Sequence, residues 1–131
     1  MGNLGILLIQ QEHPADALPH LMEVLSLHQQ LEDVVSQAET LNNLGLAYNK
    51  IEETEKALHC YQQSAEIKNG LGDTKGELPS WTNYLIACMN QHRPIPSDVL
   101  SRAKQLAILL QDVQTMSWLE NLPIPGEHDG A

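Results

Sequence analysis

Three asparagines lie forty residues apart in this chain of 131 residues, and each is followed three positions later by a large aliphatic residue. The asparagines are Asn3, Asn43 and Asn83, and the aliphatic residues are Ile6, Leu46 and Ile86. A primary amide can both donate and accept hydrogen bonds, so it can bind both polar groups of an extended peptide backbone. Helix interiors disfavour Asn. The repeated pair therefore indicates a surface that binds a peptide; inheritance from repeat duplication, without present function, is the alternative.

Other polar residues give weaker indications of chemistry. Asp16, His20 and Glu23 share one face of an expected helix and could contact one ion, although a solvated face is the favoured interpretation. The two cysteines, Cys60 and Cys88, are isolated, and Cys88 is expected to be a small buried hydrophobic residue. The sequence carries no nucleophile–base signature and no glycine-rich phosphate loop. We predict no catalytic residue, no metal and no cofactor.

The charge balance narrows the class of partner. The formal net charge is −10, with seven basic residues that form no cluster. Nucleic acids and anionic membrane surfaces are therefore disfavoured, and a neutral or basic protein segment is the expected partner. The apolar run 4–9 is too short to span a bilayer. A cytoplasmic location is the default expectation.

The helices that position these residues are predicted from an internal repeat, which appears when the sequence is compared with itself. A shift of forty residues aligns four features without a gap: Leu4-Gly5 with Leu44-Gly45, Ala17-Leu18 with Ala57-Leu58, Leu31 with Leu71, and Asp33 with Asp73. The apolar residues recur at helical spacing. We predict helices at 1–12, 14–30, 33–51, 53–69, 74–92, 97–111 and 113–122, with Gly70 and Gly72 ending the fourth and Ser97 as the N-cap of the sixth.

The second unit shows how its two helices would pack. Leu41, Leu44, Gly45 and Tyr48 share one face of the first helix, and Ala57 and Tyr61 follow at helical spacing on the second. We expect the small Gly45 and Ala57 to let the two helices approach closely, with the tyrosines filling the space beside them.

This pattern resembles the tetratricopeptide repeat, in a variety with a forty-residue period. The first unit matches less fully, and the third keeps Trp81 but has Leu85 in place of Gly, with Pro79 predicting a kink or a late helix start. The signature residues are Leu4, Gly5, Ala17, Leu44, Gly45, Tyr48, Ala57, Tyr61 and Trp81.

The resemblance implies an all-α fold, a right-handed superhelical solenoid of antiparallel helix pairs. One domain would cover residues 1–122, with repeats at 1–32, 33–72 and 73–111, a capping helix at 112–122, and a flexible tail at 123–131.

The resemblance also implies a function. It indicates a non-enzymatic module that binds an extended peptide or a partner helix in a concave groove lined by the first helices. The groove residues would be Asn3, Ile6, Asn43, Leu46, Lys50, Asn83 and Ile86. A clamp for acidic chaperone tails is disfavoured, because Asn42 and Thr82 stand where that clamp needs basic residues. The alternatives are a self-assembly unit, pairing as a homodimer through the N-terminal repeat, and a regulatory segment of a larger protein.

Overall fold

The structure is a computed structural model that describes residues 13–123. Within this range the chain forms six helices and no strand: α2 (Pro14–Gln30), α3 (Val34–Lys50), α4 (Thr54–Gly70), α5 (Thr74–Asn90), α6 (Ser97–Leu109) and α7 (Val113–Glu120). Each predicted helix in this range is confirmed to within two residues at either end. The predicted helix 1–12 lies outside the described residues, as does most of the predicted tail.

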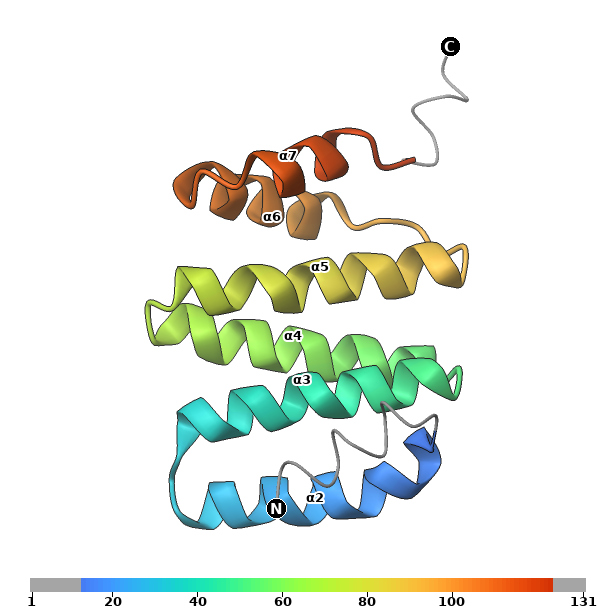
Figure 1. Ribbon diagram of the computed structural model, residues 1–131, viewed down its shortest axis with the longest axis vertical. Coiled ribbons are helices and arrows are strands. Elements are labelled where there is room, and N and C mark those ends of the chain that lie inside the picture. Colours follow the sequence, from blue (N-terminus) through green and yellow to red (C-terminus); the bar gives the residue numbers. More distant parts are fainter. Residues whose placement is uncertain (1–12, 124–131) are drawn as a thin grey trace.

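The helices stack along the long axis of the molecule in chain order (Figure 1). Each helix packs against the next, and α3 also contacts α5 directly. The predicted all-α solenoid of antiparallel helix pairs is therefore confirmed. In this arrangement α3 and α5 are the first helices of consecutive pairs.

A left-handed residue follows each of five helices, α2 to α6. These residues are Glu32, Glu52, Gly72, His92 and Gln111, with φ between 53° and 72°. After α2, the N–H of Glu32 donates to Gln29 O at 3.2 Å and the N–H of Asp33 donates to His28 O at 2.9 Å. This pair of bonds is the Schellman arrangement, which satisfies the last carbonyls of a helix and reverses the chain. The other four turns repeat it, so antiparallel pairing follows from the helix ends.

Aspartates begin the first helix of each pair in the described range. Asp33, Asp73 and Asp112 accept a hydrogen bond from the backbone N–H three residues later, at 3.1, 2.9 and 3.0 Å. Such caps satisfy N–H groups that have no partner inside the helix. The third aspartate marks α7 as the counterpart of α3 and α5. Ser97, in contrast, is wrong as an N-cap: α6 begins after Pro96, and no side chain caps it.

The close approach of α3 and α4 depends on Gly45. A Cβ atom at Gly45 would lie 2.5 Å from Cε1 of Tyr61, whose side chain is buried. The predicted role of Gly45 in close packing is therefore confirmed. Tyr61 belongs to the larger of two core clusters, which extends through α4–α7, while the smaller joins α2, α3 and Cys60. The half-buried Tyr48 packs against both clusters and so connects them.

Pro79 does not delay the start of its helix, so the prediction of a late start is wrong. The helix α5 begins at Thr74 and runs past Pro79 to Asn90. The Asp73 cap and the buried residues Leu78 and Ser80 on either side of Pro79 hold the first turns in place. Pro79 is the sixth residue of α5, so it removes one intrahelical hydrogen bond, and the helix nevertheless continues past it.

A buried carboxylate joins the second helix pair to the third. Glu77 of α5 is 1% exposed and accepts hydrogen bonds from Arg102 of α6, Trp81 of α5 and Asn69 of α4. Burial raises the pKa of Glu77, but the hydrogen bonds from these three residues and the charge of Arg102 outweigh it, so the net pKa is lowered. Glu77 therefore remains ionised inside the stack.

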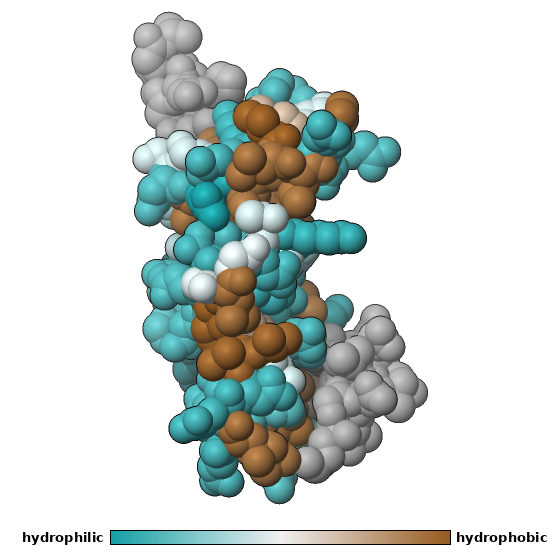
Figure 2. Space-filling view, turned by 90° about the vertical axis from the view of Figure 1, so that its left-hand side faces the viewer, coloured by the Kyte–Doolittle hydropathy of each residue, from teal (hydrophilic) through white to brown (hydrophobic). Residues whose placement is uncertain are grey.

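The edge of the stack where the α2–α3, α4–α5 and α6–α7 turns lie carries apolar patches separated by hydrophilic side chains (Figure 2). Exposed apolar residues at these turns include Leu31, Val34, Val35, Leu71, Leu109 and Val113.

Candidate peptide-binding face

The two predicted groove asparagines of the described range take different positions. Asn83 of α5 is half-buried, and its Nδ2 donates to Oδ1 of Asn42 on α3 at 3.2 Å. The amide therefore contacts the neighbouring first helix through Asn42 and not through Asn43. Asn43 is also half-buried. The structure thus joins α3 and α5 by one amide pair, offset by a residue from the predicted row.

The other predicted residues on α3 differ in exposure. Leu46 is half-buried and packs against the larger core cluster, so part of its side chain serves the fold. Lys50 is exposed at the last position of α3.

Ile86 of α5 lies beside a surface hollow that α7 helps to form. It is 41% exposed. The hollow has a volume of about 230 Å³ and is lined by Thr82, Ile86, Gln114, Thr115 and Trp118. An aliphatic side chain and an indole ring therefore line a polar-edged recess between two successive first helices. We call the surface that bears Asn42, Asn43, Asn83, Ile86 and Trp118 the α3–α5–α7 face.

Trp118 and its neighbours on α7 were missed as site residues by the sequence reasoning. The capping aspartates give the register that locates them. Trp118 lies six residues after Asp112, and Glu39 lies six residues after Asp33, so the two residues occupy equivalent positions on α7 and α3. Glu39 is exposed, on the side of α3 opposite to its packing residues. Trp118 is half-buried and packs against the larger core cluster, so part of its side chain serves the fold. Its indole N–H is a hydrogen-bond donor, which makes it a candidate contact to a ligand.

The groove residues Asn3 and Ile6, and the signature residues Leu4 and Gly5, lie outside the described residues. Of the other signature residues, Ala17, Leu44, Gly45, Ala57 and Tyr61 are buried, and Tyr48 and Trp81 are half-buried.

The described residues assemble little that could support catalysis. Burial raises the pKa of the Cys60 thiol to about 11, and it also raises the pKa of Cys88, which disfavours the reactive thiolate of both. Asp16, His20 and Glu23 are exposed on α2. Between residues 13 and 123, no three His, Cys, Asp or Glu side chains are grouped so as to hold a metal ion. None of the helices in the described part of the chain is both long and apolar enough to cross a membrane.

In a comparison with known protein families, the model of a tetratricopeptide repeat family matches residues 1–70. No curated protein matches the sequence.

Proposed function

This chain belongs to the tetratricopeptide repeat family, and we propose that it is a non-enzymatic interaction module whose α3–α5–α7 face binds an extended segment of a partner protein. Members of this family generally mediate protein–protein interaction. The carrying observation is the hollow beside Ile86 and Trp118, which lies on the same helix layer as the Asn42–Asn83 pair.

The hollow is suited to one large side chain of the ligand. Its volume is about 230 Å³. Tryptophan in a partly desolvated recess is a common energetic centre of protein interfaces. We therefore assign Trp118 and Ile86 as the apolar anchor of the site.

The amide pair leaves hydrogen-bonding capacity for a peptide backbone. After donating one hydrogen to Asn42, Asn83 keeps its Oδ1 and its second N–H, and Asn42 keeps both of its N–H groups. Neighbouring helices pack about 8–10 Å apart, so the path from α3 to α7 is roughly 20 Å. At about 3.3 Å per extended residue, this path accommodates around six residues of ligand.

The charge of the chain favours a neutral or basic ligand. The formal net charge is −10, so a segment rich in Asp and Glu would be repelled as it approaches. This restricts the proposal to ligand segments without an acidic cluster.

Selection from a random peptide library on the immobilised full chain tests the proposal. Titration calorimetry would then compare the selected peptide on wild type, Asn83→Ala and Trp118→Ala, with Leu71→Ala as a control, because Leu71 is an exposed apolar residue at the α4–α5 turn. We expect losses of about 1 kcal/mol for Asn83→Ala and about 2 kcal/mol for Trp118→Ala, and no loss for Leu71→Ala. Equal affinity of wild type and Trp118→Ala would move the site elsewhere.

A further inference from the structure

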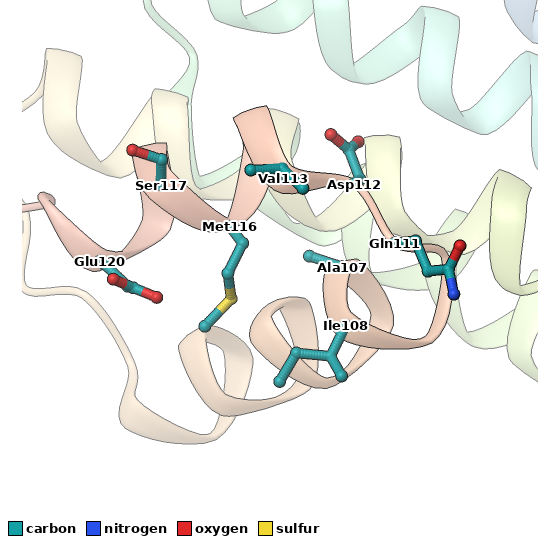
Figure 3. A pocket seen from close by; sticks show the side chains of 8 residues that line it. All are labelled: Ala107, Ile108, Gln111, Asp112, Val113, Met116, Ser117 and Glu120. Carbon is teal, nitrogen blue, oxygen red and sulfur yellow. The ribbon is translucent and has the colours of Figure 1, made fainter.

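The groove between α6 and α7 is a second apolar surface, separate from the α3–α5–α7 face. Its volume is about 350 Å³, and it is lined by Ala107, Ile108, Gln111, Asp112, Val113, Met116, Ser117 and Glu120. Figure 3 shows Met116 of α7 and Ile108 of α6 extending into this space. Ile108 is 63% exposed and Val113 is 77% exposed, among the most exposed apolar residues in the described range. No helix among residues 13–123 covers the groove.

The repeat register shows what shape of partner fits the groove. Counting from the capping aspartates Asp73 and Asp112, Met116 corresponds to Glu77, and Ile108 corresponds to Asn69. On α4 and α5, Asn69 donates to Glu77, and Glu77 in turn binds the next helix: Arg102 of α6 donates to both of its carboxylate oxygens, at 2.9 and 2.8 Å. The equivalent surface on α6 and α7 is therefore shaped to receive one more helix.

The chemistry of the two surfaces differs, and this difference defines the partner. Ile108 and Met116 stand at the positions equivalent to the polar Asn69 and Glu77. A helix that packs on α6 and α7 therefore needs aliphatic side chains at the place where α6, packed on α5, has Arg102. The charged residues that line the groove, Asp112 and Glu120, are both acidic. The hydrogen bonds from the side chain and backbone of Thr115 lower the pKa of Asp112, which keeps its carboxylate ionised at neutral pH.

We propose that the α6–α7 groove binds an amphipathic helix of a partner protein, with an aliphatic stripe that contacts Ile108, Val113 and Met116 and with Lys or Arg beside it that face Asp112 and Glu120. Charge complementarity selects this occupant over a second copy of the chain. Two copies would bring four groove carboxylates together, on chains that each carry a formal net charge of −10.

The test uses synthetic amphipathic helical peptides of about five turns and titration calorimetry with the full chain. One peptide has a Leu stripe flanked by Lys, a second has the same stripe flanked by Glu, and a third has the Lys composition with its leucines scattered. We expect the first to bind and the other two to bind at least about tenfold more weakly, or 1.4 kcal/mol. Binding of the scattered peptide as tightly as the first would reduce the effect to non-specific charge attraction and overturn the proposal.

Surface variants locate the site. Ile108→Lys and Val113→Lys should each weaken the first peptide by about tenfold or more. Val35→Lys adds the same charge at a 54% exposed valine of α3 and should bind as wild type does. Ile86→Lys should also bind this peptide with wild-type affinity, because Ile86 belongs to the α3–α5–α7 face. Weaker binding by Ile86→Lys would show that the two surfaces form a single site. If Val113→Lys bound the first peptide with wild-type affinity, the proposal would be contradicted.

Sedimentation of the wild-type chain tests the other occupant. We expect a monomer without peptide. A dimer that dissociates in Val113→Lys would show that a second copy fills the groove and would overturn the partner-helix proposal.

Discussion

The guanidinium of Arg102 donates from Nε and Nη2 to the two carboxylate oxygens of Glu77, twenty-five residues earlier in the chain, at 2.9 and 2.8 Å. This two-pronged contact fixes both the distance and the rotation of α6 against α5. Trp81 and Asn69 donate to the same carboxylate. The interface between the second and third pairs therefore has a charged, hydrogen-bonded centre.

The first prediction concerns the removal of Arg102. Arg102→Ala leaves the carboxylate of Glu77 buried without its cation, which should lower the free energy of unfolding by about 3 kcal/mol. Arg93→Ala is the matched control: its partner Glu55 has a side chain that is 78% exposed, so the loss should be below about 1 kcal/mol. Urea unfolding measures both. Equal losses in the two variants would contradict the assigned role of the buried pair.

Acid should weaken the fold partly through Glu77. Its pKa is lowered in the folded chain, so its contribution is complete above the ordinary glutamate pKa of about 4.3 and is lost as pH falls through the lowered value. The pKa values of Asp33 and Asp112 are lowered too, through hydrogen bonds from Ser36 and Thr115, and act in the same direction.

Glu77→Gln isolates the Glu77 contribution because both aspartates remain. Urea unfolding at a series of pH values should show that wild type loses stability more steeply than Glu77→Gln as pH falls below about 4.3. Parallel curves would show that Glu77 does not titrate differently in the folded chain.

Gly45 and Gly70 should respond in opposite ways to the same substitution. Gly45→Ala places a methyl group 2.5 Å from the buried ring of Tyr61, so it should cost about 1–3 kcal/mol by overpacking. Gly70, the last residue of α4, has nothing within 4 Å of a Cβ atom, so Gly70→Ala should be neutral or stabilise by up to about 1 kcal/mol. Thermal or urea unfolding distinguishes them. A Gly45→Ala variant as stable as wild type would refute close packing of α3 on Tyr61.

Neighbouring glutamates after α3 should also respond differently to glycine. Glu52 has a φ of 63°, a conformation in which glycine is less strained, so Glu52→Gly should stabilise the chain by about 0.5–1 kcal/mol. Glu53 has a φ of −88°, so Glu53→Gly should destabilise by a similar amount, about 0.5–1 kcal/mol. Both variants remove one negative charge, which makes the pair a matched comparison in urea unfolding. A loss of stability in Glu52→Gly would exclude strain at this turn.

The helix pattern could be predicted because its determinants are local. The forty-residue register is visible in Gly45, Ala57 and the capping aspartates Asp33 and Asp73; each aspartate acts within one turn, and Gly45 acts within one helix pair. The left-handed turn residues carry no such signal. Only one of the five is a glycine, Gly72; the other four are Glu32, Glu52, His92 and Gln111. The repeating chain geometry imposes that conformation on residues that disfavour it.

The site was harder to predict because it depends on helix rotation and on pairing between units. A rotation of about 100° per residue separates Asn42 from Asn43, and the packing of α3 against α5 determines that Asn42 meets Asn83. Trp118 lies beyond the region where the repeat letters align, so only the cap at Asp112 reveals its register. Arg102 and Glu77 have no counterpart in the other pairs, so repetition could not indicate them.

The central claim, ligand binding on the α3–α5–α7 face, is tested most directly by the indole signals of the two tryptophans. Trp118 lines the hollow, whereas the indole N–H of Trp81 donates to the buried Glu77 at 2.9 Å. A ¹⁵N-labelled full chain, titrated with the peptide selected on it, gives one indole N–H signal for each. We predict that the Trp118 signal shifts to saturation at the calorimetric affinity while the Trp81 signal stays in place. A Trp118 signal that is unchanged when the chain is saturated would contradict binding on this face.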